Sequence, residues 1–494
     1  MNKAMTLGCA LGAIAVSGCG THKPITVTPV YPDVSPASME GLGDTLHLDP
    51  SVIEPMHVEM LAIDLPNVVR VAVAQNIDIR QARLEVEAAR GRYDASIGRA
   101  LPVLAPTAVF DLGNGAARNT RGNIVDASFD SIRAFLFIDW VINPGLVAYD
   151  IIASKKRLAA TEHQERAVLV GTLHTSVIQY YDLILAQSRV ETARQALREA
   201  RELLRINELR VRTGTGVKAD TLRAEAHLAE RQQDLTIAMN SFYLASVDLS
   251  VTLRLDSTVT LVPSVIELGM LTLVRDELGI NQLLELAVTY RPDLESFRSL
   301  VEAVTADRKA VAWGGFGPQF QAGYLIGGIS GHNSSALPTL TGTNREERFT
   351  ASVGFRLSAD TFGNLRAANA VEQQTILEGK RMLDQVRAQV VIALQGSRAN
   401  KQLVSKASQQ VSAATEALRL TQANLSAGTM TTLDVLTAQD SLSRADLRYA
   451  HAVVGYNQAQ VDLLASLGLV DGESLGVTLD IAQDVSLEAP ASSG

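Results

Sequence analysis

Apolar and polar side chains alternate along several short stretches of the chain. From residue 348 to residue 357 the odd positions are apolar and the even positions are polar or glycine, which is the two-residue period of a strand with one apolar face. Residues 319–327 and 130–141 show a similar pattern, although Phe135 and Phe137 interrupt the second one. Together with residues 103–112, these segments predict four strands, each close to the length that crosses a bilayer as a tilted strand. A half-buried sheet in a soluble protein is the alternative.

The rest of the body has the pattern of unusually long helices. Residues 145–212 contain no proline, and a continuous helix of that length would extend roughly 100 Å. Further helices are predicted at residues 64–100, 217–254, 280–313, 362–426 and 431–468. Apolar positions spaced three or four apart, such as Ala438, Leu442 and Ala445, are rich in alanine and favour closely packed coiled coils. A soluble helical bundle has the same periodicity and is the alternative.

The body contains the same unit twice. Gly214, Asp220, Leu222, Ala224 and Leu228 recur 214 positions later as Gly428, Asp434, Leu436, Ala438 and Leu442. Residues 78–88 match residues 293–303 at an offset of 215, and Gly145 matches Gly363 at an offset of 218. Ordered matches over so long a period indicate a duplicated domain rather than a solenoid. Each half is predicted to run helix, two strands, long helix, glycine turn, long helix.

These patterns divide the chain into six segments. Residues 1–18 form a signal peptide, 19–62 an extended strap rich in proline, and 63–254 the first repeat. Residues 255–279 form a linker, 280–470 the second repeat and 471–494 a flexible tail. The prolines of the strap prevent a regular helix there.

The first nineteen residues are expected to direct export. Lys3 precedes an apolar run that ends near Val16, as in a secretory signal. Residues Val16-Ser17-Gly18-Cys19 resemble a bacterial lipobox, which implies that Cys19 carries acyl chains such as palmitate; an ordinary signal peptide with an incidental cysteine is the alternative. Glycine rather than aspartate follows the cysteine, which by the same resemblance implies the outer membrane.

Composition excludes several classes of protein. The net charge of -9 and the absence of a long basic run exclude a strongly basic nucleic-acid binder. Both cysteines lie in the leader, so a disulfide framework and a cysteine-based metal site are excluded. The body has no apolar run long enough for a transmembrane helix. The sequence lacks a phosphate loop, a zinc-protease motif and a nucleophile elbow, so we expect no enzyme, no cofactor and no metal.

Four strands are too few to seal a pore. Backbone N–H and C=O groups in lipid must be paired, so a sheet there must close on itself. Single-chain barrels begin at about eight strands. Several copies must therefore share one barrel, although this argument does not choose between two, three and four copies.

The chain resembles an outer-membrane efflux protein of the TolC type over roughly residues 60–470. The most specific segments are the two glycine turns, each followed by Asp-x-Leu at Asp220 and Asp434. The resemblance implies a mainly α fold with a long coiled-coil α-barrel and, in a homotrimer, a twelve-stranded membrane β-barrel. It also implies a passive exit duct in the outer membrane of a Gram-negative bacterium, coupled to a periplasmic adaptor protein and an inner-membrane transporter.

The resemblance also suggests roles for particular residues. Gly214, Thr215, Gly216, Gly428 and Thr429 would form the hairpin tips and contact the adaptor; simple turns are the alternative. Asp220 and Asp434 would form a carboxylate constriction at the periplasmic mouth. For Asp434, a capping role at the start of its helix is the alternative. Gly145 and Gly363 are expected at the bends from strand to helix.

A periplasmic adaptor lipoprotein without a pore is the main rival function. Such a protein would have one helical hairpin flanked by soluble β domains, whereas two hairpins and four amphipathic strands are predicted here. A coiled-coil structural lipoprotein is a second rival, and it should lack the strands. The lining residues do not identify the cargo.

Overall fold

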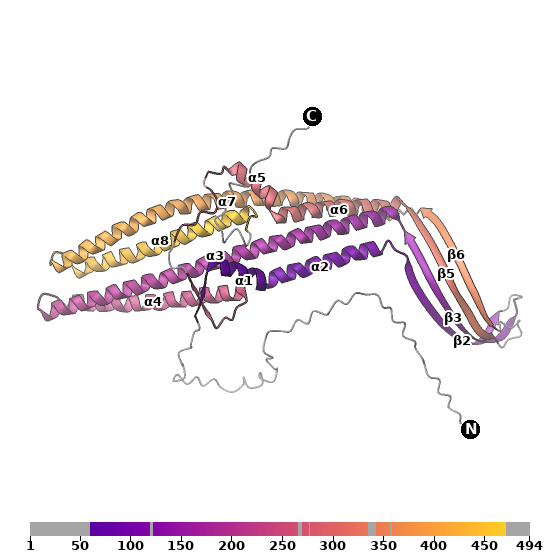
Figure 1. The fold of residues 1–494 in the computed structure, drawn as a ribbon, viewed down its shortest axis with the longest axis horizontal. Helices are drawn as coiled ribbons and strands as arrows, with labels where there is room; N and C mark the ends of the chain where they lie inside the picture. Colours follow the sequence, from indigo (N-terminus) through magenta and orange to yellow (C-terminus); the bar gives the residue numbers. More distant parts are fainter. Residues whose placement is uncertain are drawn as a thin grey trace, which may run out of the picture. The chain divides into compact units, whose positions relative to one another are not determined.

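The computed structural model describes residues 60–118, 122–264, 269–275, 277–333, 342–355 and 358–470. These residues form long helices with a four-stranded sheet at one end (Figure 1). The elements of the first half are β1 (Met60–Ile63), α1 (Leu65–Gln75), α2 (Ile77–Gly98), β2 (Val103–Arg118), β3 (Ile124–Ile142), α3 (Pro144–Arg212), α4 (Lys218–Leu253) and β4 (Thr260–Pro263). Those of the second half are α5 (Ile280–Tyr290), α6 (Pro292–Phe316), β5 (Pro318–Asn333), β6 (Gly342–Phe355), α7 (Asp360–Ser426) and α8 (Thr432–Ser466).

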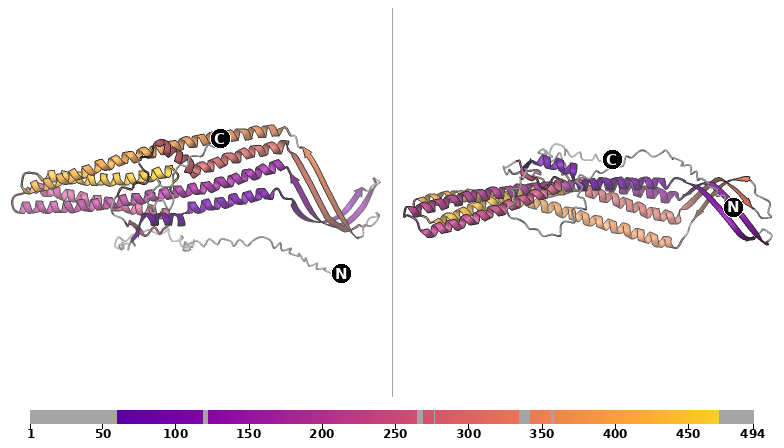
Figure 2. Two further views of the ribbon diagram at one scale, coloured as in Figure 1. Left: turned by 45° about the horizontal axis from the view of Figure 1, so that its top comes forward. Right: turned by 90° about the horizontal axis from the view of Figure 1, so that it is seen from below.

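Two antiparallel hairpins of long helices dominate the fold. Helices α3 and α4 form the first hairpin, and α7 and α8 form the second, with the two hairpins side by side (Figure 2). Helix α3 has 69 residues and α7 has 67, so each extends roughly 100 Å. The predicted long helices and the duplicated order of elements are confirmed. Among the described helices, none is both long enough and apolar enough to cross a bilayer.

The predicted helices 64–100 and 280–313 are each broken in two, which corrects the sequence analysis. The first break is at Asn76, whose side-chain Oδ1 accepts hydrogen bonds from the backbone N–H groups of Asp78 and Ile79 and so caps α2. The second break is at Arg291, which precedes Pro292. Because proline disfavours helical geometry at the residue before it, Arg291 is extended, with φ −71° and ψ 116°.

A small parallel sheet was also missed. Strand β1 pairs with β4 in the register Met60↔Thr260 to Ile63↔Pro263. It joins the end of the predicted strap to the predicted linker. Leu261 is fully buried, and its N–H donates to Ser246 Oγ at 2.7 Å. Four-residue strands are too short for alternation to reveal them.

The four-stranded sheet is antiparallel in the order β2-β3-β5-β6. Its strands are longer than predicted at the ends remote from the helices. The register sets Phe349 opposite Tyr324, Tyr324 opposite Ile138, and so on, which brings the predicted apolar faces of β3, β5 and β6 to one side. Phe135 and Phe137 lie on the opposite face with their ring centroids 5.8 Å apart.

The main core lies where the short elements meet the long helices. The largest cluster of buried apolar side chains includes Ile63, Val68, Leu173, Leu249, Leu261, Leu283, Val390 and Leu463. These residues come from β1, α1, α3, α4, β4, α5, α7 and α8. The cluster therefore joins the two repeats. Gln460 reinforces it, because its side-chain Oε1 accepts hydrogen bonds from the N–H groups of Leu273 and Val274.

The duplication is visible in the ends of α4 and α8. Arg254 and Gly468, 214 positions apart, both have left-handed backbone, with φ 59° and φ 76°. The break residue of each repeat donates to a carbonyl of the neighbouring helix end: Asn76 Nδ2 to Thr252 O at 3.4 Å, and Arg291 Nη1 to Ser466 O at 3.3 Å. Only the second site requires glycine, because a Cβ on Gly468 would lie 2.8 Å from Arg291 Cα.

We expect Gly468→Ala to lower the free energy of unfolding by at least about 1–2 kcal/mol, since left-handed backbone and the close approach both oppose a side chain. Arg254→Gly should have little effect or stabilise by less than about 1 kcal/mol, because relief of strain is partly offset by a freer unfolded chain. Thermal unfolding followed by circular dichroism in detergent measures both. Gly91→Ala, in an open position of α2, is the control and should stabilise.

Candidate functional site

The two hairpin tips have the same backbone conformation. Gly214 lies between α3 and α4 with φ 78°, and Gly428 lies between α7 and α8 with φ 77°. A Cβ at either glycine would meet no atom within 4 Å. Glycine is therefore favoured by the left-handed backbone itself rather than by crowding.

Equivalent hydrogen bonds close the two tips. The N–H groups of Thr215 and Gly216 both donate to Arg210 O at 2.9 Å, and the N–H of Thr429 donates to Asn424 O at 3.0 Å. The hydroxyls of Thr215 and Thr429 donate to the same two carbonyls, at 3.2 and 3.1 Å. The predicted tip residues thus all lie in the turns, where the exposed side chains of Val217 and Met430 lie beside the polar threonines.

Asp434 caps α8. Its Oδ2 accepts hydrogen bonds from the N–H and the hydroxyl of Thr431, at 2.8 and 2.7 Å. The Thr431 hydroxyl in turn faces the N–H of Asp434 at 3.3 Å, which completes a capping box. These hydrogen bonds lower the pKa of the Asp434 carboxyl below its ordinary value. The carboxylate is exposed and stays charged at neutral pH.

Asp220 occupies the equivalent place in the first turn of α4, where negative charge is favoured by the helix dipole. No side chain caps this helix at Val217. The carboxylate pairs instead with Arg223 on the same helix, at 3.1 Å. Asp220 and Asp434 belong to different hairpins, and within the described residues each carboxylate has its partner on its own hairpin, Arg223 for Asp220 and Thr431 for Asp434.

Gly145 and Gly363 differ in their surroundings. Gly145 is the second residue of α3, and a Cβ there would overlap the ring of Trp313, at 2.0 Å. Asn143 supports this junction, because its Oδ1 caps α3 and its Nδ2 donates to Trp313 O at 2.8 Å. Gly363 lies within the first turn of α7, and a Cβ there would meet nothing within 4 Å.

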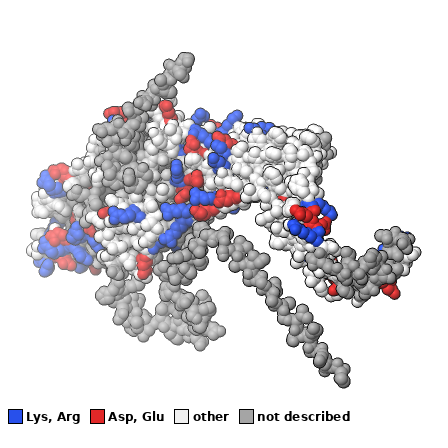
Figure 3. Space-filling view, turned by 45° about the vertical axis from the view of Figure 1, so that its right-hand side comes forward, with Lys and Arg blue, Asp and Glu red and all other residues white. Residues whose placement is uncertain are grey.

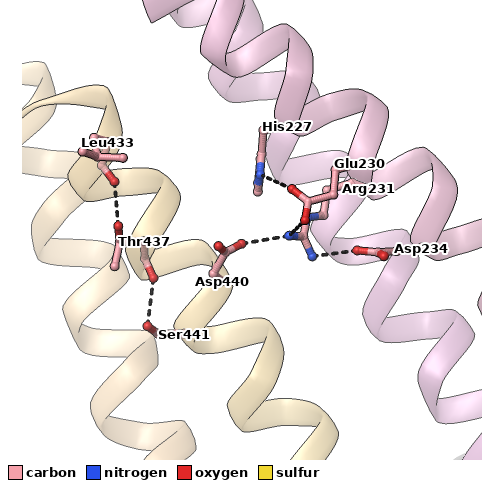
Figure 4. A network of polar contacts seen from close by, with 8 residues as sticks. All are labelled: His227, Glu230, Arg231, Asp234, Leu433, Thr437, Asp440 and Ser441. Atoms are coloured by element: carbon pink, nitrogen blue, oxygen red, sulfur yellow. Dashed lines mark hydrogen bonds and ion pairs between the residues drawn. The ribbon is translucent and has the colours of Figure 1, made fainter.

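A polar network links the two hairpins a few turns away from the tips (Figure 4). Arg231 of α4 points toward α8, and its Nη2 lies 3.0 Å from Asp440 Oδ1. Its Nη1 lies 2.8 Å from Asp234 Oδ2 on its own helix, and Glu230 is 3.5 Å away. The Arg231 side chain is only 13% exposed. A partly buried guanidinium among three carboxylates holds α4 against α8.

Three further contacts join helix α3 to α8. Thr432 Oγ1 donates to Asn207 Oδ1 at 2.8 Å in the buried interface next to the tips. Farther along, Arg189 Nη2 lies 2.8 Å from His451 Nε2, and His174 Nε2 lies 2.7 Å from Asp462 Oδ1. A cavity of about 350 Å³ between α3, α4 and α8 is lined by Arg189, Arg231 and Asp440, among others. The hairpins are therefore tied by polar contacts along their length.

The sequence analysis missed Arg231 and Asp440. A signal was present, because Arg231 continues the buried positions Thr221, Ala224 and His227 of α4 at intervals of three or four residues. A charged residue in such a stripe needs a partner. Only the packing of α4 against α8 identifies that partner as Asp440, because the two residues are 209 positions apart.

Charged side chains of both signs lie close together on one face of the described residues (Figure 3). Figure 3 shows basic and acidic side chains interspersed over the face in view. Such a surface does not match the phosphate backbone of a nucleic acid. Cys19 lies outside the described residues.

A protein family described as "Outer membrane efflux protein" matches residues 68–253 and 283–469 of the chain. The two matched segments correspond to the two repeats. The chain is also similar to the alkaline protease secretion protein AprF of Pseudomonas aeruginosa. The two are 25% identical over 425 residues, which cover 81% of this chain and 83% of AprF.

Solved structures have the same fold. The outer-membrane channel OprN superposes with a TM-score of 0.72 at 21% identity, covering 82% of this chain and 90% of OprN. The outer membrane protein VceC of Vibrio cholerae superposes with a TM-score of 0.71 at 19% identity, covering 82% of this chain and 96% of VceC.

We expect the unfolding free energy to fall as the pH is lowered from about 7 to about 5, partly through His227 and His451. Burial and the neighbouring arginines, Arg231 and Arg189, lower the pKa of both imidazoles below the ordinary 6.5. Below that value the unfolded chain binds more protons than the folded chain, so stability is lost as pH falls. Thermal unfolding midpoints of His227→Gln/His451→Gln should depend less on pH than those of the wild type. Equal slopes would contradict this assignment.

Proposed function

The chain belongs to the outer membrane efflux protein family, and from this membership we propose that three copies form one exit duct from periplasm to exterior. The four strands of each copy would contribute to a twelve-stranded barrel, and the paired hairpins would continue as a helical tube. An adaptor and an inner-membrane transporter would supply the energy. AprF is named for secretion of a protease, so export of a polypeptide is a cargo class to test alongside efflux of small molecules.

The free edges of the sheet are the observation that carries this proposal. In the part of the chain that the structure describes, β2 and β6 each have a sheet neighbour on one side only. They are 16 and 14 residues long, and an open edge of that length cannot stay unpaired in lipid. Additional copies of the same chain would supply the missing neighbours. An adaptor without a pore would have no need of this sheet.

The tips would be the mouth of the duct. In a closed duct, Arg231–Asp440 and Asn207–Thr432 would hold the hairpins together, and opening would require α8 to separate from α4 and α3. Asp220 and Asp434, repeated in each copy, would place carboxylates around the opening and favour cations there. The polar turns at Thr215 and Thr429 would meet the adaptor.

The anchor is a separate part of the proposal. Cys19 would carry acyl chains after signal cleavage. One acyl chain holds a protein only weakly, so the lipid would assist the sheet rather than replace it.

We expect Asp434→Ala to raise the single-channel conductance of the full-length protein in planar bilayers and to reduce its cation selectivity. The physical reason is loss of fixed negative charge at the mouth together with a weaker cap on α8. Asp256→Ala is a matched control, because Asp256 also accepts hydrogen bonds from a threonine N–H and hydroxyl, those of Thr258, in a turn remote from the tips. Unchanged conductance and selectivity in Asp434→Ala would count against the constriction.

We expect Arg231→Met to increase the fraction of time that the channel spends open. The substitution removes the link to α8 and leaves three carboxylates that repel one another. Arg205→Met, which removes an exposed pair with Glu202 within α3, is the control. Bilayer recordings measure both variants. An Arg231→Met channel as closed as the wild type would show that this link does not hold the mouth.

A further inference from the structure

The two edge strands of the sheet expose large apolar side chains on the same face. On β6, Val353 and Phe355 are 62% and 69% exposed; on β2, Phe110 and Leu112 are 61% and 73% exposed. In the antiparallel sheet, β2 of a second copy would run antiparallel to β6 of the first. The edges can pair in several registers, and the duplication of the chain selects one of them.

The junction between β3 and β5 provides the template. It joins the last strand of the first repeat to the first strand of the second repeat, with Leu136 opposite Ile326 and Ile138 opposite Tyr324. A contact between β6 and β2 of the next copy again joins a last strand to a first strand. If the repeats are equivalent, the two junctions have equivalent registers.

The equivalence of the strands can be read from the sequence. Ala108, Phe110, Leu112 and Gly113 of β2 correspond to Ala322, Tyr324, Ile326 and Gly327 of β5 at an offset of 214. Ala134, Leu136 and Ile138 of β3 correspond to Ala351, Val353 and Phe355 of β6 at an offset of 217.

The hairpins of the structure provide an independent check. In the first repeat, Phe110 is opposite Ile132. The two offsets convert this pair into Tyr324 opposite Phe349, which is the observed pair in the second repeat. The offsets therefore describe the backbone as well as the sequence.

We infer that, in the trimer proposed above, β6 of each copy pairs with β2 of the next copy with Val353 opposite Leu112. This inference rests on the proposed function. Each pair of the template is converted by adding 217 to the β3 residue and subtracting 214 from the β5 residue. The pair Leu136↔Ile326 is thereby converted into Val353↔Leu112, and Ile138↔Tyr324 into Phe355↔Phe110. The pair Asp130↔His332 becomes Glu347↔Arg118.

The chemistry of the facing residues fits this register. Apolar side chains meet on the outer face, with two phenylalanines opposite each other, and Glu347 meets a residue of opposite charge, Arg118. A shift of two residues in one direction would set Arg345 opposite Arg118, which is unfavourable. A shift of two in the other direction would set Val353 opposite Asn114. A shift of one residue would turn the apolar face of one strand toward the polar face of the other.

Disulfide cross-linking of the full-length protein in detergent or membranes tests the register. The variant Val353→Cys/Leu112→Cys should form a covalent trimer on oxidation with diamide, seen as a shift from monomer on a denaturing, non-reducing gel. Directly opposed residues have Cα atoms about 4.5–5.5 Å apart, within the range of a disulfide. Pairing Val353→Cys with Phe110→Cys or Asn114→Cys is the matched control, because two residues displace the partner by about 6.6 Å along the strand.

The outcomes separate the register from the assembly. Each single-cysteine variant should stay monomeric on the gel, since Cys9 lies in the proposed signal peptide and an acylated Cys19 has no free thiol. A cross-link through Phe110→Cys or Asn114→Cys in place of Leu112→Cys would overturn the register but not the trimer. A particle of three copies that forms no cross-link in any of the three pairs would have the same meaning. A particle with the mass of one chain in mild detergent would overturn the assembly, and the register with it.

Discussion

The unpaired edges of a four-stranded sheet are the constraint on which the rest of the molecule depends. Within the described residues, β2 and β6 are the edge strands of the sheet, and in lipid the backbone N–H and C=O groups of a sheet edge must be paired. In the proposed assembly other copies close the sheet, and a closed ring of sheets would leave a central space. The long helices that continue from the strands must then surround the same axis. The requirement to pair backbone groups in the membrane thus shapes the part of the protein outside it.

The helical hairpins solve a different problem, because they must form a stable wall that can still open at one end. Apolar packing is concentrated where β1, β4, α1 and α5 meet the long helices. Toward the tips, a smaller apolar cluster that includes Leu203 of α3 and Val435 and Leu442 of α8 joins the hairpins, together with polar pairs such as Arg231–Asp440 and Asn207–Thr432. Separating a polar pair costs less free energy than exposing a closely packed apolar core, because water can replace each partner of the pair. In the proposed duct, the smaller apolar cluster near the tips would make them the easier end of the hairpins to separate.

The particular errors of the sequence analysis have physical causes. Alternation located β3, β5 and β6, because each has a face of consistent polarity over many residues, and β2 was predicted beside them. It missed β1 and β4, whose four residues are too few to show a period. Helical periodicity continued through Asn76 and Arg291, although Pro292 signalled the second break. The alternative interpretation of Asp434 as a helix cap agrees with its hydrogen bonds to Thr431. The position of Asp434 relative to a pore depends on how several subunits assemble, which one subunit does not determine.

The sequence by itself determined the long helices and strands and their duplication. The elements follow from local hydrophobic periodicity, and the duplication follows from matches such as Gly214 with Gly428. It also indicated the left-handed turns, because the preference for glycine there comes from the local backbone conformation and not from tertiary contacts. Only the tertiary structure decided which distant residues meet: Arg231 with Asp440, Trp313 over Gly145, and β1 with β4. Those contacts join segments up to about two hundred residues apart, and their energy depends on how helices and strands pack, which local patterns do not encode.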